Sequence, residues 1–219
     1  MKQKITSEFI GTYFLVFAGT GAIVVNSLTN SITHVGIALT FGLVILVSVF
    51  TFGHISGGHF NPAVTVGFLI KKEMSFKDAS YYIATQIIAA ITASLTIFLL
   101  FGNVASLGIT MPSGSLLQSF ILELIMTFFL MFVILTVTSD KKSKAFAGLA
   151  IGGTITLEAL FGGPISGASM NPARSIGPAI ISGNFNHLWL YIVATILGAI
   201  LASLLYMIVT DKEEEEVKE

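Results

Sequence analysis

The sequence predicts an all-α membrane protein with six transmembrane helices plus two re-entrant half-helices, arranged as an inverted 3+3 repeat. Three observations support this fold class. Of 219 residues, 54% are hydrophobic and only 11% are charged, a composition typical of multi-span membrane proteins. The tripeptide Asn-Pro-Ala occurs twice, at Asn61-Pro62-Ala63 and at Asn171-Pro172-Ala173. Finally, segments of the first half recur in the second half.

Six apolar stretches are long enough to cross a hydrocarbon core of about 30 Å as helices. The first follows Lys2 and Lys4 and has no small-residue cleavage site, so we expect it to be retained and not removed as a signal peptide. The six predicted spans lie near residues 5–27, 33–53, 79–101, 116–138, 145–162 and 187–210.

Two shorter apolar runs, residues 61–70 and 171–182, would form helices of about 15 Å, half the thickness of a bilayer core. Asn is a good N-cap, and Pro at the first helical position has no N–H that needs a partner. Each Asn-Pro-Ala therefore predicts the start of a half-helix inside the membrane. The glycine-rich approaches, Gly57-Gly58 and Gly162-Gly163 with Gly167, are expected to be extended backbone whose carbonyls face a water-filled lumen.

The internal repeat fixes the arrangement of the halves. Because each half has an odd number of spans, the second must be inverted relative to the first, and the half-helices should enter from opposite faces and meet, Asn61 against Asn171. We expect a single domain over residues 1–219, with repeat one at about 5–101, repeat two at about 116–210 and an acidic tail at 211–219. The matched segments are Glu8 to Phe17 with Glu123 to Phe132, Ile55 to Ala63 with Ile165 to Ala173, and Tyr82 to Ser94 with Tyr191 to Ser203.

Charge placement predicts the orientation. Arg174 is the one basic residue in the connections on one side of the six spans, and all the lysines fall on the other side. By the positive-inside rule we expect both termini to be cytoplasmic. We also expect a multi-pass protein of the plasma (inner) membrane. The lysines are Lys2, Lys4, Lys71, Lys72, Lys77, Lys141, Lys142, Lys144, Lys212 and Lys218.

Several classes of function are disfavoured. A net charge of −1 argues against nucleic acid as a partner, and the absence of Cys excludes disulfides and thiolate metal sites. His54 and His59 lack a nearby carboxylate in the sequence, so we expect no metal and no cofactor. No arrangement of nucleophile and base suggests an enzyme. A secondary transporter stays open as an alternative, because such proteins also use inverted repeats and half-helices.

At these residues the chain resembles the major intrinsic protein family of aquaporins and aquaglyceroporins. The stretches HISGGHFNPAVT, GPISGASMNPARSIGPA and ELIMTFFLMF carry the resemblance, and the second half is most similar to nodulin-like intrinsic proteins and their prokaryotic relatives. The resemblance implies a homotetramer in the lipid bilayer, each subunit a passive channel for water and small neutral solutes such as glycerol that excludes ions and protons. Neutral metalloid acids (arsenite, boric or silicic acid), ammonia and urea are alternative solutes.

The resemblance also assigns roles to residues. It places a selectivity filter at Phe41, Ala159, Ala168 and Arg174, and it makes Glu8 and Glu123 structural acceptors for loop N–H groups. Water-selective members have His at the position of Ala159. Glycerol channels have Trp at the position of Phe41, a small residue at the position of Ala159 and usually Asp at the position of Ser175. This chain shares only the small residue with them, so the filter is mixed, and two of its four walls are methyl groups, which makes it wide. Glu158 has no counterpart in the repeat; it could hold loop backbone, face a neighbouring subunit or add negative charge near Arg174. The expected pore-lining carbonyls belong to Gly57, Gly58, His59, Gly167 and Ser169.

Overall fold

The computed structural model describes residues 1–216, with side chains described through Thr210. The six predicted spans are confirmed as long apolar helices, most of them a few residues longer than expected. The last helix continues past residue 210 into the predicted acidic tail, since Glu and Lys are good helix formers, and residues 217–219 of that tail lie outside the described residues. The helices are α1 (Lys2–Thr29), α2 (Thr33–Ser56), α4 (Phe76–Phe101), α5 (Leu116–Ser139), α7 (Ala147–Ser166) and α9 (Leu188–Glu216).

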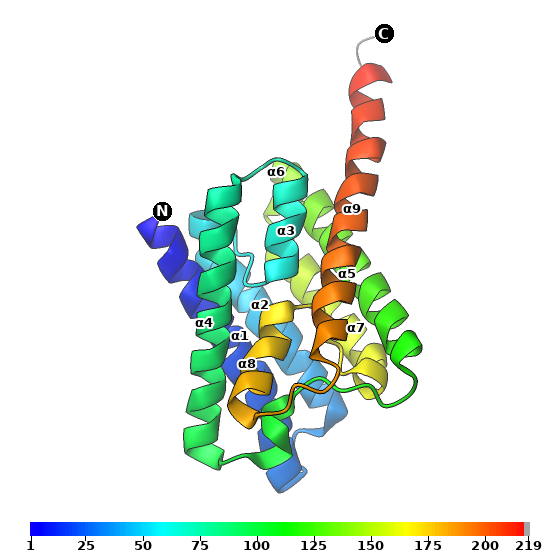
Figure 1. Cartoon of the computed structure of the whole chain (residues 1–219). Coiled ribbons are helices and arrows are strands. Elements are labelled where there is room, and N and C mark those ends of the chain that lie inside the picture. The colour runs from blue at the N-terminus through cyan, green and yellow to red at the C-terminus, as the bar shows by residue number, and fades with distance from the viewer. Residues whose placement is uncertain (217–219) are drawn as a thin grey trace.

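The two predicted half-helices are confirmed as α3 (Pro62–Ile70) and α8 (Pro172–Ser182). Each has its asparagine as N-cap: the Asn61 side chain accepts from the backbone N–H of Ala63, and the Asn171 side chain accepts from the N–H groups of Ala173 and Arg174. Figure 1 shows α3 in one half of the bundle and α8 in the other, both starting near the middle and running in opposite directions. Because the second half of the chain is inverted, the two N-termini face each other at mid-depth.

Close helix crossings join the two repeats. Helices α2 and α7 approach until Gly42 and Gly152 face each other, and a Cβ added to either glycine would collide with the carbonyl oxygen of the other. Small residues at such crossings let membrane helices approach closely. Two short elements complete the fold, α6 (Lys141–Lys144) and the 3-10 turn η1 (Val104–Gly108) between α4 and α5. The repeats therefore form one bundle around the two half-helices.

One expectation about the backbone was wrong. Gly162 and Gly163 are not extended, because α7 continues through Pro164 to Ser166. Pro164 has no N–H to donate to the carbonyl of Leu160, and His34 Nε2 lies 2.7 Å from that oxygen instead. Gly163 leaves room for the His34 ring, since an added Cβ would lie 2.8 Å from His34 Cε1. These glycines allow packing, and the non-helical approach to α8 begins only at Gly167.

Candidate solute pathway

Three cavities follow one another through the bundle. The central cavity, about 40 Å³, is lined by Asn61 and Asn171. Two larger cavities adjoin it and are named here by their lining residues: the inner cavity, about 280 Å³, is lined by Lys4 and Lys144, and the outer cavity, about 290 Å³, is lined by His34 and Met111. His59 lines both the inner and the central cavity. The four predicted filter residues line both the central and the outer cavity: Phe41, Ala159, Ala168 and Arg174. The cavities therefore form a row in which the central cavity is the smallest of the three.

The two Asn-Pro-Ala motifs hold each other through reciprocal hydrogen bonds. Asn61 Nδ2 donates to the carbonyl of Met170 at 2.7 Å, and Asn171 Nδ2 donates to the carbonyl of Phe60 at 2.9 Å. Phe60 and Met170 have φ of 49° and 52°, the left-handed conformation that turns each loop toward the opposite motif. Each asparagine therefore caps its own half-helix with its side-chain oxygen and fastens the opposite loop with its amide nitrogen.

Two buried glutamates bind the loops that precede the half-helices. Glu8 accepts hydrogen bonds from the backbone N–H groups of His59, at 3.0 Å, and Phe60, at 2.8 Å. Glu123 accepts from the N–H groups of Ser169, at 2.8 Å, and Met170, at 2.9 Å. These loops are not helical, and Phe60, Ser169 and Met170 are buried. Each carboxylate therefore supplies the acceptors that a strand or helix would otherwise provide.

The same loops carry two tyrosine contacts that the sequence did not identify. Tyr82 donates to the carbonyl of Ser56 and Tyr191 donates to the carbonyl of Ser166, each at 2.7 Å. Both carbonyls belong to the last residue of a long helix, where no intrahelical donor remains. The internal repeat could have indicated these contacts, since Tyr82 and Tyr191 occupy matching positions in the two halves.

At the outer end of the central cavity, Arg174 is only 2% exposed. Its Nη1 donates to the carbonyl of Gly108 at 2.7 Å, and its Nε has no hydrogen-bond partner within the described part of the chain. The guanidinium carbon lies 5.1 Å from the centroid of the Phe41 ring. With methyl groups at Ala159 and Ala168, this opening has three apolar walls and one cationic donor.

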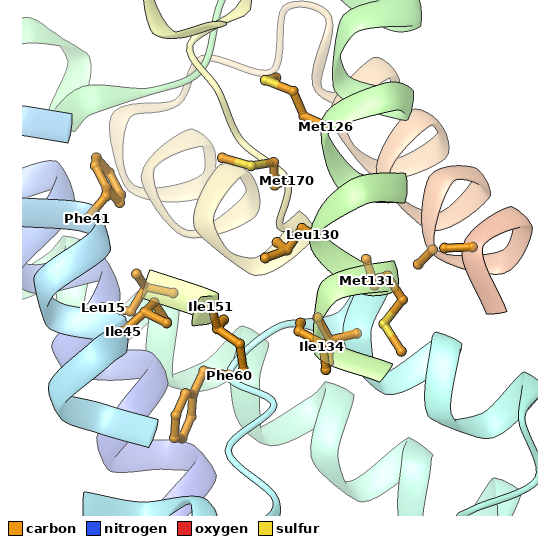
Figure 2. Packing of buried hydrophobic residues seen from close by; sticks show 14 of the residues in the cluster. Leu15, Phe41, Ile45, Phe60, Met126, Leu130, Met131, Ile134, Ile151 and Met170 are labelled. Atoms are coloured by element: carbon orange, nitrogen blue, oxygen red, sulfur yellow. The ribbon is translucent and has the colours of Figure 1, made fainter. Parts of the chain in front are cut away.

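Apart from the two motif asparagines, Arg174, His59 and Ser169, the side chains that line the central cavity are apolar. Figure 2 shows several of these side chains converging from α1, α2, α5 and α7. Such walls offer a solute few hydrogen bonds, so polar contacts concentrate at these five residues and at the loop backbone. The apolar lining includes Leu15, Ile45, Leu130, Ile134, Ile151 and Ile155.

The inner end of the central cavity is bounded by His59. Its Nδ1 lies 3.1 Å from the Thr65 hydroxyl, and its ring stacks on Phe68 with centroids 4.6 Å apart. The residues expected to supply carbonyls are spread along the row. Gly57 lines the inner cavity, Gly58, His59 and Ser169 line the central one, and Gly167 lines the outer one.

Glu158 lies outside this row. It lines a groove between α5 and α7 with Phe129 and Leu157, and its Oε2 has no hydrogen-bond partner among residues 1–210. The residues that line the central and outer cavities do not include Glu158. Among the described residues, no three His, Asp or Glu side chains lie close enough together to hold a metal ion.

A bundle of six apolar spans around a row of cavities, with two opposed half-helices at its centre, is the architecture of a membrane channel. The chain belongs to the major intrinsic protein family, whose family model matches residues 1–206. Membership makes it a channel protein and not an enzyme. The predicted resemblance to this family is confirmed.

Individual relatives agree with this assignment. The chain is 49% identical to Nodulin-26 of Glycine max over 219 residues, covering 98% of this chain and 81% of that protein. It is 44% identical to Aquaporin NIP1-1 of Zea mays over 220 residues, covering 98% of this chain and 78% of that protein. The fold is similar to that of the aquaglyceroporin from Plasmodium falciparum, with a TM-score of 0.82 and 26% identity over 93% of this chain and 94% of that one.

Proposed function

We propose that this chain is a passive channel that conducts water and small neutral solutes such as glycerol and excludes ions and protons. One observation carries the proposal: the central and outer cavities meet at Phe41, Ala159, Ala168 and Arg174, an opening with one cation among three apolar side chains. Similarity to proteins named aquaporin and aquaglyceroporin supports it.

Ion exclusion follows from the charges around the central cavity. The N-termini of α3 and α8 both face it, and the N-terminus of a helix carries a partial positive charge. Arg174 adds a full charge at the outer opening, so a cation meets repulsion at the outer opening and in the central cavity. For neutral solutes, Asn61 and Asn171 each have a second amide hydrogen beyond the one bonded to the opposite loop, available to a passing oxygen.

The shape and chemistry of the opening favour glycerol in addition to water. Ala159 and Ala168 leave room that larger side chains would fill, and the Arg174 guanidinium is a hydrogen-bond donor that lines both cavities. A polyol can lie with its carbon face on Phe41 and its hydroxyls toward this donor. Neutral metalloid acids, ammonia and urea fit the same description and are the alternative solutes.

The family assignment disfavours a secondary transporter, the alternative class that the sequence alone left open. A transporter would need a site for a coupling ion, and among the described residues that line the central cavity there is no carboxylate. Its flux would saturate, depend on an ion gradient and have a high activation energy. Channel flux would rise linearly with solute concentration and have a low activation energy.

We also propose that the protein is a homotetramer in the plasma (inner) membrane with both termini cytoplasmic. The inner cavity is lined by Lys4 and Lys144, at the end of the bundle where the positive-inside rule expects the cytoplasm. The outer cavity, which Arg174 lines, then faces the opposite compartment.

Proteoliposome swelling tests the proposed function. Purified protein should speed shrinkage in an impermeant osmolyte and swelling in glycerol, with fluxes that do not saturate and that survive dissipation of ion gradients. Boric acid and urea gradients in the same vesicles rank the alternative solutes. Saturating glycerol uptake that requires an ion gradient would establish a transporter, and vesicles no more permeable than empty ones would exclude both classes.

A further inference from the structure

The loop between α4 and α5 reaches into the outer opening and touches Arg174. Its carbonyl at Gly108 accepts the one hydrogen bond found for the Arg174 guanidinium among residues 1–210. The position of that carbonyl therefore decides where the charged group lies. No motif in the sequence marks this loop.

The backbone that presents the carbonyl is unusual. Ala105, Ser106 and Leu107 all have positive φ, between 47° and 58°, and Gly108 follows with φ of 71°. Consecutive non-glycine residues in this conformation are rare and persist only when their surroundings hold them. Leu107 is fully buried against Val24 and Ile97, which anchors the turn from below. The turn also needs a contact on the side that faces the pore.

On the side of the pore, a series of hydrogen-bonded hydroxyl groups holds the loop against α8. Thr110 Oγ1 lies 2.8 Å from Ser175 Oγ, which lies 2.6 Å from Ser169 Oγ. Ser169 Oγ in turn donates to the carbonyl of Asn171, the N-cap of α8, at 3.0 Å. All three hydroxyl residues are buried, and Ser175 follows Arg174 directly in the chain. Thr110 is thus hydrogen-bonded to α8, the helix that carries Arg174. In the chain, Thr110 stands two residues after Gly108, whose carbonyl accepts from Arg174.

We infer that Thr110 is a specificity-determining positioning residue: its hydroxyl fixes the loop on α8 and thereby sets the place of the Arg174 guanidinium in the filter. This inference rests on the proposed function and adds a residue to its filter. Loss of the Thr110 hydroxyl frees the Gly108 carbonyl to move, and the guanidinium moves with it. The opening then admits larger polyols and discriminates less between glycerol and water.

Thr110→Val tests the inference, because valine keeps the branched shape and replaces the hydroxyl with a methyl group that cannot hydrogen-bond. Ser113→Ala is the matched control: Ser113 is on the same loop and its hydroxyl donates to the carbonyls of Pro164 and Ile165, away from Arg174. Thr110→Ser restores the hydroxyl. We expect Thr110→Val to raise the ratio of glycerol to water permeability in proteoliposomes, and Thr110→Ser and Ser113→Ala to leave it near the wild-type value.

A second readout does not depend on transport. Arg174 is the single arginine in the sequence, so modification by 2,3-butanedione, measured by mass spectrometry, reports on this side chain alone. Losing one hydrogen bond should speed modification of Thr110→Val roughly fivefold over wild type. If wild type conducts neither solute, the proposed function fails while this rate still decides the inference. Equal modification rates and equal permeability ratios in wild type and Thr110→Val, or equal changes in Ser113→Ala, would overturn it.

Discussion

The guanidinium carbon of Arg174, on α8, lies 5.1 Å from the centroid of the Phe41 ring, on α2. At this separation a cation is attracted to the face of an aromatic ring, which helps to keep the guanidinium at the side of the opening and not across it. The two residues come from opposite repeats, and together they set both the charge and the width of the outer opening.

Removing the charge should let cations or protons leak. A unit charge about 4 Å away is worth about 4 kcal/mol at an effective dielectric of about 20. Even a third of that barrier corresponds to about tenfold in flux, so we expect Arg174→Val to raise proton or potassium flux by at least that factor. A pH-sensitive dye trapped in proteoliposomes measures the leak. Arg174→Lys keeps the charge, so its vesicles should stay impermeable to protons and potassium. If Arg174→Val conducts water but not protons, the dipoles of the two half-helices are enough to exclude cations without Arg174.

Narrowing the opening should separate glycerol from water. Ala159→His adds a ring to one of the two small walls and supplies a second polar group beside Arg174. Steric exclusion at a constriction grows steeply with solute size, so glycerol flux should fall much more than water flux. The ratio of the two swelling rates in the same vesicle preparation is the measurement. An equal reduction of both fluxes would mean that the filter lies elsewhere.

A glycine in α1 leaves room for the Phe41 ring. A Cβ added at Gly19 would collide with that ring, whereas a Cβ added at Gly21, on the same helix, would meet only Ile97 Cδ1 at 3.9 Å. Both substitutions to alanine bring the same gain in helix propensity, about 1 kcal/mol. A difference in permeability between the two variants therefore reports on the displacement of Phe41 alone.

We therefore expect Gly19→Ala to alter the ratio of glycerol to water permeability, and Gly21→Ala to leave it unchanged. Both should fold and migrate as wild type on size exclusion. A Gly19→Ala protein with wild-type selectivity would indicate that Phe41 does not limit the opening.

The two kinds of buried carboxyl group should respond differently to amide substitution. Glu123 accepts from two backbone N–H groups and from Ser166, and Glu123→Gln turns an NH₂ group toward at least one of these donors. Each buried group left unpaired costs about 1–3 kcal/mol. Glu158→Gln removes an acidic group whose Oε2 has no partner in the described chain.

Thermal unfolding in detergent, followed by intrinsic fluorescence, compares the two variants. Glu123→Gln should lower the melting temperature by several degrees, and Glu158→Gln should hold it or raise it. Wild-type stability together with altered solute flux in Glu123→Gln would place that carboxylate in the solute path.

Local sequence signals were enough to predict the helices. Asn61-Pro62 and Asn171-Pro172 combine an N-cap with a residue that needs no donor, so each predicts a helix start without tertiary information. The internal repeat predicted the inversion, because an odd number of spans per half leaves no other topology. The repeat likewise matches Glu8 with Glu123, and the family resemblance assigns both as acceptors for loop N–H groups.

Only the tertiary structure decided which groups those residues meet. Gly162 and Gly163 suggested exposed backbone, yet their lack of a side chain serves the packing of Met126 and His34, which come from other helices. Gly108 and Thr110 sit in a loop with no motif, and only its folding onto α8 places them beside Arg174 and Ser175. The sequence predicts helix starts and membrane spans because both depend on residues that are close together in the chain. Hydrogen bonds and steric fit in the pore instead join residues distant in the chain, so they depend on how the helices pack.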